Sequence, residues 1–241
     1  MQVESTKGRG LHVGLIGGLG PAATVAYYQR LSEMAAERSH RLELTIVQAD
    51  SRETVANNLA GRTNEQAEIF AALLSRLKAA GADFASITAI GPHFCYEETK
   101  VLSPLPLVSA ISPLDDFCVA QGYHKVGLLG TARTMKTCLF GQLSQTKTLI
   151  PSNVDGIGKA YQDMAISAFC TDATRNMLFA AGAEMIEAGA EAVALSGTDL
   201  LLAFAGHDPG YPVIDALEVH AKLLADLATG HKALTDVEST Q

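Results

Sequence analysis

The stretch His12-Val13-Gly14-Leu15-Ile16-Gly17 recurs 113 residues later as Lys125-Val126-Gly127-Leu128-Leu129-Gly130. Each copy is a continuous apolar run that stops at a glycine, which is typical of a strand buried on both faces in a parallel sheet. A second pair follows in the same order, because residues 81–87 resemble residues 189–195 at an offset of 108. The repeat indicates that the chain consists of two similar halves.

Long Ala/Leu-rich stretches at 66–80 and 174–188 precede the second strand pair, which indicates a helix, a glycine stop and a strand. A third and weaker pair joins 106–111 to 212–217 at an offset of 106. Strands joined by crossovers longer than a dozen residues must run parallel, with helices on their faces. The sequence therefore predicts an α/β fold of two pseudo-symmetric lobes, each a parallel sheet flanked by helices.

The last predicted helix is expected to return from the second half of the chain to the first lobe. We predict a first lobe made of residues 1–107 and 215–241 and a second lobe made of residues 108–214, because a C-terminal helix at 215–229 should return to the first lobe. No Gly/Ser-rich or Pro-rich linker separates the lobes, so they should press against each other. Ligands of open α/β sheets bind beyond the carboxyl ends of the strands, so we expect the site in the cleft between the lobes.

Composition excludes several classes of protein. The 241 residues are 48% hydrophobic and 18% charged, which fits a globular protein rather than a disordered one. The net charge of −8 argues against a nucleic-acid partner. The start of the chain does not resemble a signal peptide and no apolar run reaches membrane-spanning length, so we expect a cytoplasmic protein without a membrane partner. No metal site is expected, because neither the histidines nor the cysteines have ligand spacing; the cysteines are Cys95, Cys118, Cys138 and Cys170.

A glycine-rich segment, Gly17-Gly18-Leu19-Gly20-Pro21, follows the first predicted strand. Proline suits the first position of a helix, and the free amides of a helix N-terminus can hold an anion. Gly18 and Gly20 are therefore candidates for binding a small carboxylate, although a tight glycine turn explains the same residues. The segment matches neither the dinucleotide fingerprint nor the P-loop, so nucleotide binding is disfavoured.

Polar residues gather after the third predicted strand of each half. Thr88 in the first half corresponds to Ser196 in the second, and Thr198 follows two residues later. Their hydroxyls could bind a carboxylate or cap the following helices. Arg52, Arg62 and Arg133 could supply the positive charge, because the guanidinium fork matches a carboxylate, although most surface arginines are only solvated.

Residues 14–21 resemble the opening segment of the aspartate/glutamate racemase family, whose racemases use no cofactor. Gly130-Thr131 and residues 212–215 are also similar to that family, and the resemblance covers almost the whole chain. It implies a two-lobed fold, no cofactor, a possible homodimer, and a substrate-binding position for Thr131. In that family one thiolate removes the α-proton of an amino acid, and an opposed thiol delivers a proton to the other face.

The sequence departs from the family at both thiols. The first cysteine motif falls on residues 89–93 and the second on residues 196–200, so that Ala89 and Gly197 occupy the positions of the two cysteines. A methyl group and a hydrogen atom cannot exchange protons with a substrate. The resemblance therefore assigns Ala89 and Gly197 to the substrate-binding site and makes two-thiol chemistry unavailable there.

Other side chains could replace the thiols. His93 keeps the histidine of the first motif and could transfer a proton near neutral pH, or it could orient backbone. Cys95 lies six residues beyond Ala89 and is poorly placed. Asp199 replaces the glutamate of the second motif and suits a hydrogen-bond acceptor better than a base. The hydroxyls of Thr88 and Ser196 would need an activating partner.

Three functions remain open. The first is an isomerase or lyase that binds an amino acid or dicarboxylate and uses chemistry without thiols. The second is a binding or regulatory protein that holds such a ligand without turnover, and the third is a residual aspartate/glutamate racemase. A titratable side chain in the space between Ala89 and Gly197 would favour an enzyme, and a space lined by apolar or hydroxyl groups would favour binding.

Overall fold

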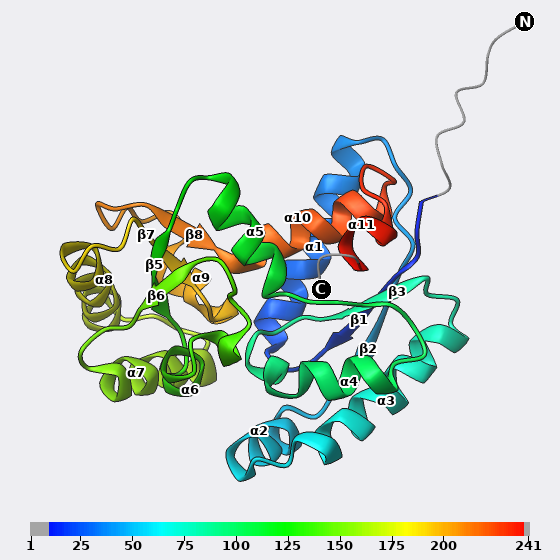
Figure 1. Ribbon diagram of the computed structural model, residues 1–241, viewed down its shortest axis with the longest axis horizontal. Helices are drawn as coiled ribbons and strands as arrows, with labels where there is room; N and C mark the ends of the chain where they lie inside the picture. Colours follow the sequence, from blue (N-terminus) through cyan, green and yellow to red (C-terminus); the bar gives the residue numbers. More distant parts are fainter. Residues whose placement is uncertain (1–9, 239–241) are drawn as a thin grey trace, which may run out of the picture.

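The computed structural model describes residues 10–238 and contains two parallel four-stranded sheets side by side (Figure 1). The first sheet has the order β2-β1-β3-β4 and the second the order β6-β5-β7-β8, so each half of the chain places its strands alike. The strands are β1 (Val13–Gly17), β2 (Leu44–Gln48), β3 (Phe84–Ile87), β4 (Leu107–Val108), β5 (Lys125–Leu129), β6 (Lys147–Leu149), β7 (Ala192–Leu195) and β8 (Val213–Asp215). This arrangement confirms the predicted α/β fold of two lobes.

Helices cover the sheets. The α-helices are α1 (Pro21–Glu37), α2 (Ser51–Ala60), α3 (Thr63–Ala79), α4 (Tyr96–Leu102), α5 (Ser112–Ala120), α6 (Ala132–Lys136), α7 (Val154–Ser167), α8 (Asp172–Glu187), α9 (Leu201–Phe204), α10 (Ala216–Ala228) and α11 (Leu234–Glu238). Three short 3₁₀ turns are η1 (Gly91–Cys95), η2 (Leu139–Gly141) and η3 (Thr198–Leu200). None of the helices within residues 10–238 has the length and apolar character needed to cross a membrane.

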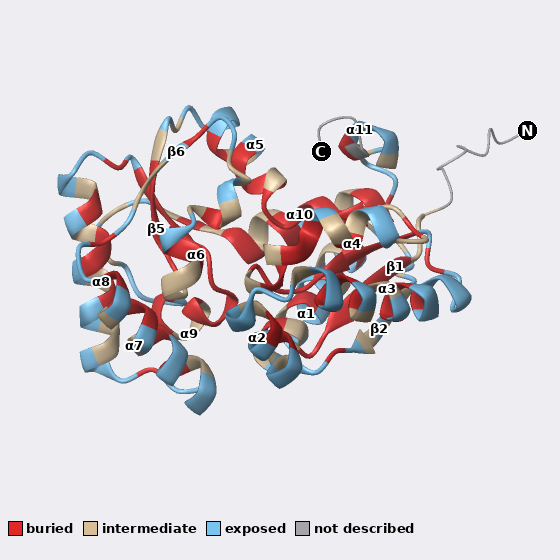
Figure 2. Cartoon of the chain, turned by 60° about the horizontal axis from the view of Figure 1, so that its bottom comes forward, coloured by how far each residue is buried: buried red, intermediate tan, exposed pale blue. Residues whose placement is uncertain are grey.

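The first strand shows why both faces of the sheet must be covered. Val13 and Leu15 pack with α1 and α10 on one face, whereas Ile16 packs with α3 on the other. All three side chains are fully buried, and burial of each contributes roughly 1.5–3 kcal/mol. Figure 2 shows the same layering, with buried central strands and helices whose outer faces are exposed. The continuous apolar run in the sequence reflects this two-sided burial.

The chain crosses between the lobes twice, and α5 and α10 follow the two crossings. Helix α5 packs into the core of the second sheet, whereas α10 returns to the first sheet beside α1 (Figure 1). Val108 lies in β4 of the first sheet and Asp215 in β8 of the second. The first crossing therefore comes after Val108 and the second after Asp215, each at least one residue beyond the predicted boundary between the lobes.

A chain of buried polar groups holds α10 against the first sheet. The hydroxyl of Tyr27 lies 2.7 Å from Nδ1 of His220, and Nε2 of His220 lies 2.9 Å from Oγ of Ser86. The Ser86 hydroxyl donates to the carbonyl of Val108 at 2.6 Å, so its oxygen is left to accept from His220. Tyr27 then donates to His220, and each of the three buried side chains has a hydrogen-bond partner.

We expect Tyr27→Phe to lower the free energy of unfolding by about 1–3 kcal/mol, because it leaves Nδ1 of the buried His220 without a donor. Tyr28→Phe is the matched control, since the neighbouring Tyr28 is 54% exposed. Urea denaturation of the two variants measures the difference. Equal urea midpoints for the two variants would show that the hydrogen bonds of the buried Tyr27, His220 and Ser86 side chains do not stabilise the fold.

Candidate active site

In each lobe, one hydroxyl side chain joins the carboxyl ends of the two central strands, β1 and β3 in the first lobe and β5 and β7 in the second. The amide and the hydroxyl of Thr88 both donate to the carbonyl of Ile16, each at 3.1 Å. In the second lobe, the amide and the hydroxyl of Ser196 both donate to the carbonyl of Leu129, each at 2.7 Å. The internal repeat therefore extends to individual hydrogen bonds. Both buried hydroxyls donate their protons to the main chain. These hydrogen bonds argue against the catalytic role predicted for Thr88 and Ser196.

The glycine-rich segment of the first lobe faces the second lobe. Gly18 has a φ of +82°, and a Cβ at this position would collide with the side chain of Gln48. Gly20 precedes α1, and the nearest charged atoms to its open side are the carboxylate oxygens of Asp199, which would lie 3.6 and 3.9 Å from a Cβ placed at Gly20. The N-terminal end of α1 therefore already has an anion beside it, which comes from the second lobe of the same chain.

Asp199 is held in this position by a tyrosine from α7. The hydroxyl of Tyr161 donates to Oδ2 of Asp199 at 3.2 Å, and Asp199 is only 8% exposed. Burial raises the pKa of the Asp199 carboxyl above its usual value, and the bond from Tyr161 opposes part of that shift. Burial and the nearby Asp199 charge raise the pKa of Tyr161 as well, so Tyr161 remains a protonated donor. Asp199 is thus a titratable side chain between the lobes.

Tyr161 also fills the space beside Gly197. A Cβ at Gly197 would lie 2.6–2.8 Å from Cζ, Cε2 and the hydroxyl of Tyr161. The backbone of Gly197 is extended, with φ −147° and ψ 120°, a conformation that any residue can adopt. The tyrosine ring, rather than backbone strain, therefore excludes a side chain at this position. The sequence alone does not indicate Tyr161, because this residue lies 36 positions before Gly197 and α7 carries no motif.

We expect Gly197→Ala to destabilise the protein by about 1–3 kcal/mol, because the new methyl group would displace the buried ring of Tyr161. Gly91→Ala is the matched control, since a Cβ at Gly91 would meet no atom within 4 Å. Thermal unfolding of both variants tests the difference. If Gly197→Ala unfolds at the same temperature as Gly91→Ala, the ring does not occupy this space in solution.

The Ala89 side of the candidate site contains a histidine whose ring nitrogens are both engaged. Nδ1 of His93 lies 2.9 Å from the carbonyl of Ala89, and the amide of Ala110 donates to Nε2 at 3.0 Å. His93 is therefore neutral, with its proton on Nδ1, and its ring stacks on Tyr96. Burial lowers the pKa of His93 to about 4. These contacts correct the predicted role in proton transfer and support the alternative, in which His93 orients the backbone.

The other titratable side chains within residues 89–96 are also engaged. The thiol of Cys95 contacts the carbonyl of Pro92 at 3.4 Å, and burial raises its pKa to about 11. The hydroxyl of Tyr96 donates to the carbonyl of Leu107 at 2.7 Å. No thiolate therefore forms on this side near neutral pH. Ala89 itself is buried and contributes only a methyl group.

Of the three candidate arginines, Arg133 is the one that joins the lobes. It belongs to α6 of the second lobe, donates to the carbonyl of Asn58 in α2, and lies over the ring of Phe94 at 5.7 Å. Arg52 and Arg62 lie on the exposed surface, at the start of α2 and just before α3. The structure therefore brings Arg133 to the meeting point of the lobes and leaves the other two in solvent.

The two remaining predicted threonines differ in what they bind. Thr131 caps α6, because its hydroxyl oxygen accepts from the amide of Thr134 at 3.1 Å. The Thr198 hydroxyl has no hydrogen-bond partner among residues 10–238 and is not fully buried, so it is available to a ligand. Within the same residues, no three His, Cys, Asp or Glu side chains converge in a way that could hold a metal ion.

The sequence and the fold of this chain were compared with those of known proteins. Residues 16–224 match the family model described as Asp/Glu/Hydantoin racemase. A candidate Asp/Glu racemase from Yersinia pestis is 22% identical, with a TM-score of 0.79 over 90% of this chain and 99% of that one. An aspartate racemase homologue from Pyrococcus horikoshii is 25% identical, with a TM-score of 0.74 over 90% and 99% of the two chains.

A glutamate racemase from Bacillus anthracis shares 13% identity, with a TM-score of 0.63 over 94% of this chain and 84% of that one. The likeness to these structures extends over both lobes and most of the length of each relative. Together with the match to the family model, the duplicated sheets and the glycine-rich segment show that this chain belongs to the Asp/Glu/hydantoin racemase family.

Proposed function

We propose that this protein is an enzyme that binds a small carboxylate between its lobes and moves a proton on one face of the α-carbon. Asp199 is the proton-transfer group in this proposal, and Tyr161 is the residue that positions it. The proposal rests on the Tyr161–Asp199 hydrogen bond beside Gly197, because it supplies a titratable group where the family resemblance assigns a thiol.

The chemistry follows from the properties of a buried carboxyl. The Asp199 carboxylate accepts the α-proton, and the electron pair of the C–H bond stays on the substrate as an enolate. The protonated carboxyl then returns a proton to the same face, after exchange with solvent. Burial raises the pKa of Asp199 and makes its carboxylate a stronger base than an exposed one.

The Ala89 side favours a reaction on one face only. The titratable side chains within residues 89–96 all bond to the main chain, so they offer no second proton donor to the opposite face. We therefore favour an isomerase or lyase with chemistry that needs one acid–base group. Residues 89–96 therefore provide no group for the second step of the residual two-base racemase of our third hypothesis.

The substrate carboxylate is best placed near Arg133 and Thr198. Asp199 lies against Gly20, so a second anion at the N-terminal end of α1 would be repelled by it. Arg133 offers a guanidinium where the lobes meet, and Thr198 offers a hydroxyl without a partner in the described part of the chain. Gly18 and Gly20 then shape the loop beside Asp199 rather than bind the carboxylate.

A second candidate is a protein that binds a carboxylate without turnover. One observation favours it, namely that the ring of Tyr161 fills the space beside Gly197 while the Ala89 side presents a methyl group. Such a site could hold a ligand and still lack the room for an opposed acid–base pair.

Deuterium exchange separates the two candidates. The protein is incubated in D₂O with a panel of small amino, hydroxy and dicarboxylic acids, and deuterium at the α-carbon is measured by NMR and mass spectrometry. We expect exchange into at least one member of the panel, at a rate above that of buffer. Calorimetric binding without exchange would support the binding protein, and the absence of both binding and exchange would contradict both candidates.

A further inference from the structure

A cavity of about 350 Å³ lies between α5 and α10, and it shares no residue with the candidate active site. Its volume is at the low end of the roughly 300–1,000 Å³ that is usual for ligand sites. The apolar part of its wall includes Pro113 and Phe117 from α5, Leu223 from α10, and Val237 from α11. A ligand the size of an amino acid would fit this space.

The wall of the cavity comes from both lobes. Phe117 lies on α5, whose inner face packs into the core of the second lobe, whereas Leu223 lies on α10 and packs into the core of the first. These two helices begin directly after the two crossings between the lobes. A molecule bound here would therefore contact both lobes at the point where the chain passes between them.

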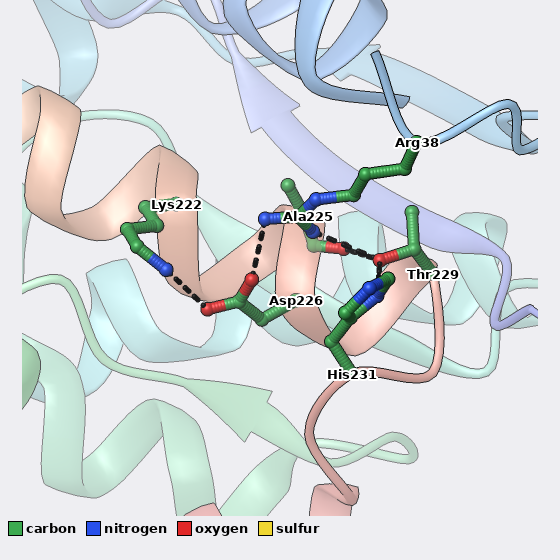
Figure 3. Close-up of polar contacts among 6 residues, drawn as sticks. All are labelled: Arg38, Lys222, Ala225, Asp226, Thr229 and His231. Carbon is green, nitrogen blue, oxygen red and sulfur yellow. Dashed lines mark hydrogen bonds and ion pairs between the residues drawn. The ribbon is translucent and has the colours of Figure 1, made fainter. Parts of the chain in front are cut away.

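Among the groups that the structure describes, one ammonium at the cavity has no acidic partner. Figure 3 shows the carboxylate of Asp226 between two cations, with Arg38 donating to Oδ1 at 2.6 Å and Lys222 donating to Oδ2 at 2.9 Å. Both oxygens of Asp226 are therefore engaged. Lys232 also lines the cavity, held at the end of α10 by its amide, which donates to the carbonyl of Asp226 at 3.0 Å. Its ammonium forms no ion pair with any residue that the structure describes.

The pairing of the charges favours an anion near Lys232. The charged residues that line the cavity are Lys222, Lys232, Asp226 and the exposed Asp116. Asp226 already pairs with Lys222 and, from outside this lining, with Arg38, so its carboxylate does not compete for Lys232. An apolar wall beside an ammonium that pairs with no described acidic group suits a molecule with an apolar body and one carboxylate.

We propose that this cavity is a second binding site, which takes a small carboxylate with a branched or aromatic apolar body. The body packs against Phe117 and Leu223, and the carboxylate accepts hydrogen bonds from Lys232. The site is independent of the chemistry proposed for the cleft, because none of its groups touches Asp199 or Tyr161.

Isothermal titration calorimetry with 4-methylpentanoate tests the site. We expect the wild-type protein to bind this acid and to bind the neutral 4-methylpentanamide at least about tenfold more weakly, because the amide lacks the charge that Lys232 recognises. Lys232→Gln, which keeps most of the side-chain stem, should weaken binding of the acid by a similar factor. Lys78→Gln is the matched control, since Lys78 is an exposed lysine on α3.

Arg133→Gln separates this site from the cleft, where Arg133 is the proposed partner of the substrate carboxylate, and it should leave the affinity unchanged because Arg133 does not line the second cavity. Binding that is lost in Arg133→Gln would place the acid in the cleft and overturn the proposal. Equal affinity of the acid for Lys232→Gln and Lys78→Gln, or no binding of the acid by the wild-type protein at millimolar concentration, would also overturn it.

Discussion

Asp199→Asn is expected to lower the rate of α-deuterium exchange by about 10²–10⁴-fold, which is the usual contribution of a positioned acid–base group. The amide is close to the carboxylate in size, so it can remain beside Gly20 and still accept a hydrogen bond from Tyr161. It cannot take a proton from carbon. Because only the acid–base function is removed, the binding of substrate measured by calorimetry should change far less than the rate.

The matched control is Asp208→Asn, since Asp208 is exposed and lies outside the cleft. Tyr161→Phe adds a test that distinguishes the positioning of Asp199 from a purely structural role of the tyrosine. The tyrosine hydroxyl lowers the pKa of Asp199, so its removal should raise that pKa and move the rising limb of the pH–rate profile to higher pH. Full exchange activity in Asp199→Asn, or an unshifted profile in Tyr161→Phe, would contradict the role given to this pair.

Acidification from pH 7 to pH 4.5 is expected to remove roughly 5 kcal/mol of folding free energy through two buried histidines. Burial lowers the pKa of His93 to about 4, and burial together with charge on His93 lowers that of His220 to about 3. Below about pH 6.5 the unfolded chain binds protons at these positions and the folded chain does not. The stability that the two neutral histidines contribute is therefore present above pH 6.5. It is lost as the pH falls toward their pKa values in the folded protein, by roughly 1.4 kcal/mol per pH unit for each histidine.

Two carboxyl groups act in the opposite direction. Burial raises the pKa values of Asp199 and Asp215. Their contribution to the stability of the fold therefore becomes more favourable as the pH falls toward the pKa values that they have in the unfolded chain. Asp115, whose carboxylate accepts bonds from residues 144–146 and has a lowered pKa, adds to the loss at the acid end. The histidine effect can still be isolated by measuring slopes rather than absolute stabilities.

Urea midpoints at pH 7, 6 and 5 give the slope of stability against pH. We expect His220→Gln to reduce the loss per pH unit by about half, even if it lowers stability at pH 7, because one of the two contributing histidines is gone. His207→Gln, at an exposed position, should leave the slope unchanged. A slope that is the same in all three proteins would show that the buried histidines do not control acid stability.

The sequence predicts much of the fold because the repeat has a physical cause. Gly14 and Gly127 occupy the same place in the first strand of each half, and a Cβ at Gly14 would press against Leu77 of α3, whereas one at Gly127 would press against Met185 of α8. Both glycines allow a helix to approach its sheet closely. Apolar strands that end in glycine therefore identify the duplicated sheet before any contact is known.

The candidate site is only partly predictable from the sequence. The strand ends identify Asp199 and Gly197, because the topology of parallel sheets brings them to the cleft. Tyr161 is not predictable in this way, since its contact with Gly197 depends on how α7 packs over the end of β7. The role of His93 is also set by distant backbone, because the amide that engages Nε2 belongs to Ala110, 17 residues further along the chain.

The measurement that tests the central claim most directly is the stereochemical outcome of exchange. A single enantiomer of the substrate found in the deuterium panel is incubated in D₂O with the wild-type protein, and the recovered acid is separated by chiral chromatography with mass detection. A single acid–base group beside Gly197 predicts that deuterium enters with retention of configuration and that the opposite enantiomer does not accumulate. Formation of the deuterated opposite enantiomer at the rate of exchange would contradict the account, because it would require a second proton donor on the Ala89 side.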